Sequence, residues 1–189
     1  MKILFVSGSF RKQSFNSQLA RMAMKAIENQ AECRLLSYTD VPFFNQDEEI
    51  PVQSPVQTVR DQFEWADGVW FFTPEYNGMI PGVLKNLLDW MSRSIDLSNP
   101  AGKSVLSGKP ACISGAGGRP AAARSRAQLD QLLKNCRMSV YDQSVGVSLT
   151  PDEFKTNEFV DPNIIENTLK EQGEGFLAWI ERKDESTKA

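Results

Sequence analysis

Histidine is absent from this chain of 189 residues. Without an imidazole, the chain cannot contain a Ser-His-Asp or Cys-His nucleophile pair, a zinc site with a histidine ligand, or a histidine that acts as general acid or base near neutral pH. Catalysis therefore has to come from carboxylates, lysine, tyrosine, cysteine, or a bound cofactor that brings its own chemistry.

Cysteine, long apolar runs and excess charge are scarce as well. Cys33, Cys112 and Cys136 are odd in number and far apart, with no C-x-x-C pair, which is typical of reduced thiols in a cytoplasmic protein. The apolar run at residues 3–6 is too short for a signal peptide, and no window approaches the roughly 18 apolar residues of a membrane span. The formal net charge of −3 lacks the basic excess of a nucleic-acid binder. We expect a cytoplasmic protein that binds neither nucleic acid nor membrane.

The elements along the chain predict an α/β fold. Short apolar runs predict five strands, the last one interrupted by polar residues, at 2–7, 33–38, 68–73, 110–114 and within 138–147. Apolar residues at helical spacing predict five helices, at 16–27, 56–66, 81–94, 121–135 and 162–182. Because parallel strands need crossover connections, this alternation predicts a five-stranded parallel sheet in a three-layer α/β/α sandwich. We expect one domain over residues 1–182 and a frayed tail at 183–189.

The loop after the first strand has the composition of an anion site. Ser9, Arg11, Ser14 and Asn16 lie where a helix begins, so backbone N–H groups, the positive end of the helix and a guanidinium converge there. The alternative is that Ser14 or Asn16 merely caps the helix while Arg11 is solvated. The combination of these residues favours a phosphate. The loop is neither a G-x-G-x-x-G motif nor a P-loop, and the Gly-Lys-Ser at 102–104 follows no strand.

The loop after the third strand, residues 73–82, can hold a flat ring. Its prolines and glycines fix an irregular backbone, while Tyr76 offers an aromatic face and Asn77 an amide. Taken alone, it is equally well a loop that happens to carry an aromatic residue. Ligands of such sheets bind beyond the carboxyl ends of the strands, so a phosphate at one loop and a ring at the next describe a mononucleotide. FMN suits a chain without histidine, because its isoalloxazine carries the redox chemistry.

The glycine-rich loop after the fourth strand, residues 114–118, allows two interpretations. It either lets the backbone approach a ligand closely or forms a flexible turn. Arg119, Arg124 and Arg126 follow it, and they either are solvated or contact an anionic second substrate such as a nicotinamide nucleotide phosphate.

The first two loops together resemble the NADPH-dependent FMN reductases of the flavodoxin-like fold, a family that includes quinone, azo-dye and chromate reductases. The family's phosphate loop, G-S-x-R-x-x-S-x-N, is matched over residues 8–16. Its P-E-Y-N loop and the following P-G-x-L-K-N-x-x-D-W helix are matched at 74–77 and 81–90. The resemblance covers about residues 2–150 and implies the strand order 2-1-3-4-5.

The resemblance also implies which residues bind FMN. They are Ser9, Phe10, Arg11, Ser14, Phe15, Asn16, Pro74, Glu75, Tyr76, Asn77, Gly78, Ser114 and Gly115. The residues up to Asn16 would hold the phosphate, with Phe10 and Phe15 contributing backbone. Those from Pro74 to Asn77 would line the ribityl chain and ring, backbone N–H groups near Asn77 and Gly78 would stabilise charge on the reduced ring, and the last two would lie near the ring's other edge. A homodimer or homotetramer through the helix at 81–94, offering Trp90, Met91 and Arg93, is implied as well.

The implied activity is a ping-pong oxidation of NADPH or NADH. The nicotinamide gives a hydride to N5 of FMN and leaves, and a small-molecule acceptor, which is a quinone, azo compound, chromate-like oxyanion or free flavin, takes its place. No catalytic side chain and no metal is expected. Two alternatives stay open: an electron carrier of the flavodoxin kind, against which Arg11 and the modest negative charge argue, and a flavin-binding sensor without significant turnover.

Overall fold

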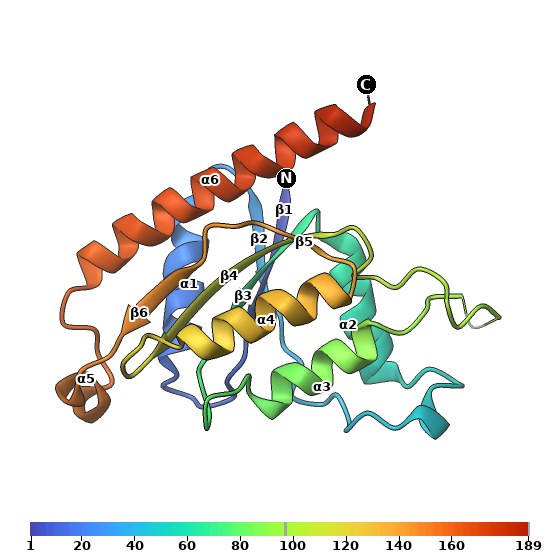
Figure 1. Ribbon diagram of the computed structural model, residues 1–189, viewed down its shortest axis with the longest axis horizontal. Coiled ribbons are helices and arrows are strands. Elements are labelled where there is room, and N and C mark those ends of the chain that lie inside the picture. Colours follow the sequence, from blue (N-terminus) through green and yellow to red (C-terminus); the bar gives the residue numbers. More distant parts are fainter. Residues whose placement is uncertain (97, 189) are drawn as a thin grey trace.

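A parallel β-sheet lies at the centre of the molecule, with helices on both of its faces, in the computed structural model, which describes residues 1–96 and 98–188 (Figure 1). Its strands are β1 (Lys2–Ser7), β2 (Glu32–Leu35), β3 (Gly68–Phe72), β4 (Pro110–Gly117), β5 (Ser139–Val140) and β6 (Val145–Ser148). The order is β2-β1-β3-β4-β5, with β6 also paired to β4, and every pair is parallel. The predicted fold class and strand order are confirmed.

Two helices cover one face of the sheet and three cover the other (Figure 1). The first group is α1 (Phe15–Ile27) and α6 (Pro162–Lys188), and the second is α2 (Ser54–Trp65), α3 (Gly82–Met91) and α4 (Ala123–Asn135). Successive side chains of a strand point to opposite faces, so Ile3 and Phe5 enter the core under α1 and α6, whereas Leu4 and Val6 enter the other. Two short helices, η1 (Gln46–Glu48) and α5 (Pro151–Thr156), lie in the connections after β2 and β6.

The sheet edge beside β4 is a single strand in two pieces, as the interrupted pattern at 138–147 predicts. β5 pairs with Pro110 and Ala111, and β6 pairs with the four residues that end β4. Between the pieces, the side chain of Gln172 on α6 donates to the carbonyl oxygens of Ile113 (2.9 Å) and Gln143 (2.7 Å). An amide side chain therefore takes the place of the missing ladder.

Strand β4 extends three residues beyond its predicted end at Ser114. Residues 114–117 pair in register with 145–148 of β6. The small residues of this stretch give no apolar signal, and only the pairing partner makes it a strand. As a result, the loop into α4 begins at Gly118.

The helix α3 does not present the residues expected to form an oligomer interface. Trp90 is 1% exposed, Met91 is fully buried in the core, and Arg93 is paired with Glu49 at 2.8 Å. The indole N–H of Trp90 donates to the carbonyl of Pro42 (2.9 Å). Each of these residues is therefore already engaged within one copy of the chain.

The helix α6 continues through Lys188 and projects past the sheet (Figure 1), so the tail expected to be frayed is helical over residues 183–188. Its last deeply buried apolar side chain is Ile180. Beyond it the chain carries residues such as Glu181 and Arg182 that favour helix, and an existing helix extends through such residues at little cost. Ala189 lies outside the described residues. None of the described helices is both long and apolar enough to span a membrane.

Candidate functional site

A cleft opens at the carboxyl-terminal edge of the sheet, where the loops after β1, β3, β4 and β6 meet. Its wall is made of Ser9, Arg11, Ser14, Phe15, Asn16, Pro74, Glu75, Tyr76, Ala116, Gly117, Gly118, Leu149 and Phe154. The structure therefore brings together most of the residues expected to bind a mononucleotide. Those that do not line the cleft are Phe10, Asn77, Gly78, Ser114 and Gly115.

The start of α1 is capped locally and still leaves donors for a ligand. The hydroxyl of Ser14 accepts from the N–H of Ser17 (3.3 Å), so the capping interpretation holds for this side chain. The helix geometry gives the N–H groups of Phe15 and Asn16 no acceptor within α1. An anion at this end of the cleft would thus meet backbone donors, the positive end of the helix and Arg11.

Asn16 fastens α1 to β4. It is 3% exposed, its Nδ2 donates to the carbonyl of Ala116 (3.0 Å), and its Oδ1 accepts from the Ala116 N–H (2.9 Å). Both polar ends of the side chain are therefore committed to the strand. Asn16 can offer a phosphate its backbone N–H, whereas its side chain sets the distance between two walls of the cleft.

Two hydroxyls link the loops after β1 and β3. The Ser9 hydroxyl lies 3.5 Å from that of Tyr76 and accepts from the Arg11 N–H at 3.4 Å. Phe10 turns out of the cleft and packs edge-on against Tyr38, with 4.8 Å between ring centroids. Burial raises the pKa of the Tyr38 phenol, whose O–H donates to the carbonyl of Ser7 (2.6 Å). The loop after β1 is thus fixed at both ends, and Phe10 can contribute only backbone to the cleft.

The loop after β3 folds into a two-residue hairpin turn. Tyr76 and Met79 exchange two backbone hydrogen bonds of 3.0 Å each, with Asn77 at φ 54° and Gly78 at φ 76° between them. Left-handed backbone at both central residues is the reason why Asn-Gly is favoured in such turns. Gln128 of α4 holds the turn by donating to the carbonyl of Gly78 (3.1 Å). Asn77 and Gly78 therefore form the tip of a rigid turn.

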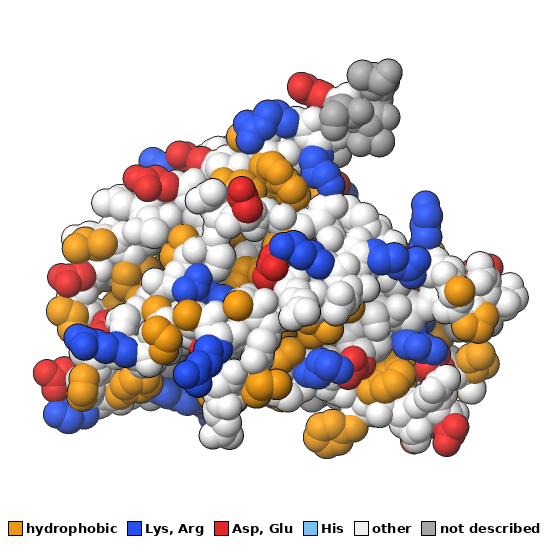
Figure 2. Space-filling view, viewed as in Figure 1, with side chains coloured by type: hydrophobic (Ala, Val, Ile, Leu, Met, Phe, Trp, Pro, Cys, Tyr) orange, Lys and Arg blue, Asp and Glu red, His pale blue; other side chains and the backbone are white. Residues whose placement is uncertain are grey.

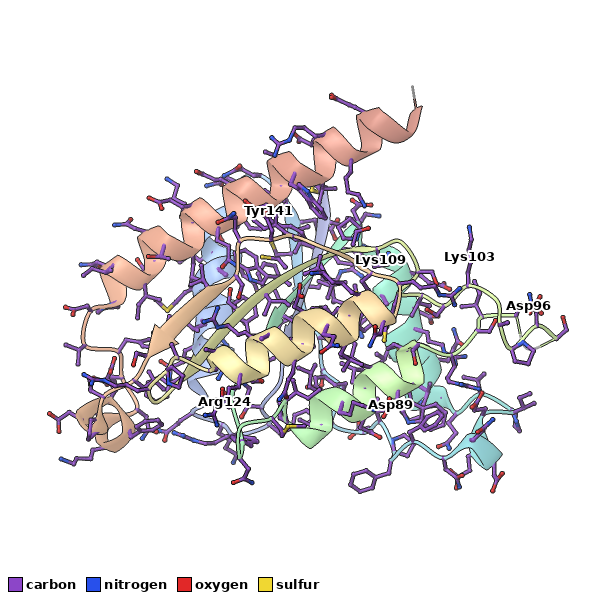
Figure 3. The ribbon with its side chains drawn as sticks, viewed as in Figure 1. Asp89, Asp96, Lys103, Lys109, Arg124 and Tyr141 are labelled. Carbon is purple, nitrogen blue, oxygen red and sulfur yellow. The ribbon has the colours of Figure 1, made fainter. Side chains whose placement is uncertain are left out.

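Glu75 caps the helix α4 from another loop. Its Oε2 accepts from the N–H groups of Arg124 (3.0 Å) and Ser125 (3.2 Å), whereas the helix's own cap residue, Ala122, has no side chain that could do so. A carboxylate at a helix N-terminus is favoured by the aligned peptide dipoles. In Figure 3, Arg124 lies where α4 begins, beside the hairpin turn. The charge of Glu75 is thus already placed against α4.

The structure corrects the expectation that Ser114 and Gly115 face the ligand. Ser114 is fully buried, and its hydroxyl accepts from the Trp70 indole (2.9 Å) and donates to Gln172 (2.7 Å). A Cβ on Gly115 would lie 2.5 Å from the carbonyl oxygen of Thr73, so this residue is enclosed as well. Because β4 runs three residues further than predicted, Ala116, Gly117 and Gly118 line the cleft in their place.

The three arginines after β4 are not equivalent. Arg126 donates to the carbonyl of Ala121 (3.2 Å) and to the hydroxyl of Ser144 (2.7 Å), and desolvation lowers its pKa. It therefore holds the loop together. Arg119 and Arg124 are exposed and stay candidates for contact with an anionic second substrate.

Sequence reasoning missed the wall that follows β6, which contributes Leu149 and Phe154. Helix α5 there begins with a capping box, in which Thr150 accepts from the Glu153 N–H (3.4 Å) and Glu153 accepts from the Thr150 N–H (2.7 Å). Desolvation opposes ionisation of Glu153, but hydrogen bonds from Thr150 and Val160 outweigh it and lower its pKa. The T-P-D-E sequence at 150–153 is the signal that could have located this helix.

The cleft thus combines the guanidinium of Arg11 and the open N–H groups of α1 with the aromatic ring of Tyr76 and the backbone at the end of β4. Among the side chains that the structure describes, no group of three or more cysteines or carboxylates is placed to hold a metal ion. This combination suits a ligand that carries both an anionic group and a flat ring.

Known proteins are similar to this chain in sequence over most of its length. The sequence model of a family described as NADPH-dependent FMN reductase matches residues 1–152. A quinone reductase of Pseudomonas putida is 35% identical over 185 residues, covering 94% of each chain. An NAD(P)H-dependent FMN reductase of Pseudomonas aeruginosa is 36% identical over 185 residues, covering 96% of each.

Solved structures of flavin-binding proteins have a similar fold. The flavoenzyme NAD(P)H:(acceptor) oxidoreductase FerB of Paracoccus denitrificans has a TM-score of 0.80 and 28% identity, covering 96% of this chain and 97% of its own. A flavodoxin of Pseudomonas aeruginosa, 19% identical with a TM-score of 0.57, shares the fold. This chain belongs to the NADPH-dependent FMN reductase family and is an oxidoreductase that uses FMN with NAD(P)H as co-substrate.

Proposed function

We propose that the protein is a quinone reductase that oxidises NAD(P)H by a ping-pong mechanism on bound FMN. The observation that carries the proposal is the convergence of Arg11 with the open N–H groups at the start of α1, at one end of a cleft whose other wall is Tyr76 and the end of β4. The quinone is proposed from similarity to quinone reductases over nearly the whole chain. Azo compounds, chromate-like oxyanions and free flavin are the other acceptors to compare.

The residues present fit FMN. Its phosphate needs positive charge and donors, and Arg11, Phe15 and Asn16 supply a guanidinium and two backbone N–H groups. Its ring needs a flat, largely apolar surface, for which Tyr76 and Ala116 are suited. When bound, FMN supplies the redox chemistry by taking up a hydride and passing on two electrons.

The chain's own contribution is to bind and orient. Asn16 sets the spacing between α1 and β4, and Glu75 fixes the start of α4 beside the turn that carries Tyr76. The turn's own two hydrogen bonds use the N–H groups of Tyr76 and Met79. We propose that those of Asn77 and Gly78 stabilise negative charge on the reduced ring. Leu149 and Phe154 would keep water from one side of the cleft.

The experiment is to purify the protein, identify its flavin, and follow NADPH and NADH oxidation with a quinone acceptor. Parallel double-reciprocal plots are expected for a ping-pong mechanism. Turnover no faster than that of free FMN would contradict the proposal and favour a carrier or sensor.

Replacing the cationic end of the cleft tests the phosphate assignment directly. Arg11→Ala removes a charge-assisted contact and is expected to weaken FMN binding by about 1.5–3 kcal/mol. Lys12→Ala, which removes an equal exposed charge outside the cleft wall, is the matched control. Unchanged FMN affinity in Arg11→Ala would show that the phosphate binds elsewhere.

We also propose a homodimer or homotetramer, formed beside α3 by the loops that flank it. Figure 2 shows apolar side chains at the surface along the margin where α3 lies, and Phe43 is 88% exposed. Burial of such side chains against a second copy is favourable. Phe43→Asp should shift the mass measured by light scattering toward the monomer, and a monomeric wild type would contradict the proposal.

A cytoplasmic location stays a prediction, supported by the use of NAD(P)H.

A further inference from the structure

The guanidinium of Arg11 is held by a residue near the other end of the chain. Its Nη2 donates to Oδ1 of Asn157, which ends helix α5. Asn157 is itself fixed, since its N–H donates to the carbonyl of Glu153 (2.7 Å) and its carbonyl accepts from Nε2 of Gln18 (3.1 Å). Arg11 therefore has a rigid neutral acceptor beside the cleft.

A neutral acceptor orients an arginine without neutralising it. Arg11 is exposed and takes part in no ion pair with another described residue, so its charge stays available to a ligand. A free arginine side chain would sample many rotamers and lose that freedom on binding, whereas one already held at Asn157 has lost part of it beforehand.

Asn157 lies outside the motifs at 8–16, 74–77 and 81–90 that carry the resemblance to the family. The family match ends at residue 152, before Asn157. The left-handed backbone at this residue, φ 60°, is the conformation that asparagine and glycine tolerate best.

We propose that Asn157 is a positioning residue that orients Arg11 toward the phosphate end of the cleft and thereby sets the preference of the protein for FMN over riboflavin, which lacks the phosphate. The inference rests on the proposed function, in which the FMN phosphate binds beside Arg11. It predicts that a change at residue 157 alters the affinity for the phosphorylated flavin and leaves that for riboflavin unchanged.

Two substitutions separate orientation from charge. Asn157→Gly keeps the left-handed backbone and removes the acceptor, and it is expected to weaken FMN binding about three- to fivefold. Asn157→Asp keeps an acceptor but pairs a carboxylate with Arg11, and it is expected to weaken FMN binding at least about tenfold, less so at high salt. Lys155→Gln changes the net charge of α5 equally but replaces a side chain paired with Asp152 (3.0 Å), so it is the matched control.

The measurement is flavin fluorescence quenching by the flavin-stripped full-length protein, titrated with FMN and with riboflavin at low and high salt. A fall in the FMN-to-riboflavin affinity ratio in both variants, with Lys155→Gln unchanged, supports the proposal. An unchanged ratio in both variants, while Arg11→Ala lowers it, overturns the role of Asn157 and leaves the flavin site intact. Wild-type protein that binds neither flavin would instead overturn the proposed function.

Discussion

The loops after β1 and β4 both lead from a strand into a helix at the cleft, yet they leave those helices in different electrostatic states. Helix α1 is capped by the neutral hydroxyl of Ser14, within its own loop. Helix α4 has Ala122 at its cap position and takes the carboxylate of Glu75 instead. Of these two positive helix ends, only that of α1 is free of a protein anion, which is a reason for the phosphate to bind there.

Removing the side chain of Asn16, which joins α1 to β4, is expected to have the largest effect. Asn16→Leu would leave the buried N–H and carbonyl groups of Ala116 without partners, and it should lower the free energy of unfolding by roughly 2–4 kcal/mol. Urea unfolding measures this, with Asn29→Leu, the same change at an exposed position, as control. Equal losses of stability in the two variants would show that the hydrogen bonds of Asn16 to β4 do not stabilise the fold.

Removing the cap of α4 should have the second-largest effect on stability. Glu75→Ala removes a charged acceptor from two backbone N–H groups and is expected to cost about 1–2 kcal/mol of stability. Glu75→Gln keeps an acceptor oxygen and should recover about half of that loss, since neutral hydrogen bonds are roughly half as strong. Ser14→Ala, the corresponding change at α1, should cost about 1 kcal/mol. Thermal unfolding of the three variants tests the contrast, which fails if Glu75→Ala is as stable as wild type.

The smallest effect concerns the backbone before α4. Ala121 has φ 58°, a conformation that glycine adopts without strain, so Ala121→Gly should raise the free energy of unfolding by about 0.5–1 kcal/mol. Ala127→Gly, inside α4 and exposed, should lower it by about 1 kcal/mol. Chemical denaturation of the pair has opposite expected signs, and a loss in both would mean that the left-handed backbone at Ala121 is not strained.

The sequence predicts features that depend on neighbouring residues and misses contacts between distant ones. Buried runs such as 68–73 and the helical spacing that follows them identify the strands and helices, and therefore the edge of the sheet at which ligands bind. The cap of α1 could be considered because Ser14 and its helix are adjacent. The cap of α4 and the tie at Asn16 could not, because their partners lie far away in the sequence.

The full length of β4 also could not be predicted from the sequence pattern. Ser114, Gly115 and Gly117 have low strand propensity, and pairing with β6 makes them a strand. Because of this difference, Ala116, Gly117 and Gly118 line the cleft, whereas the predicted Ser114 and Gly115 do not. By contrast, the capping box of α5 can be recognised in the sequence at Thr150 and Glu153. The helix itself has only 6 residues, which is too short to give a periodic apolar pattern.

The interruption between β5 and β6 makes this edge of the sheet a poor template for aggregation. An unbroken edge strand would present a continuous row of backbone donors and acceptors on which another chain could assemble. Here the two pieces have two and four residues, and the gap between them is occupied by the amide of Gln172. The two short pieces therefore leave no long, continuous edge on this side of the sheet for another chain to pair with.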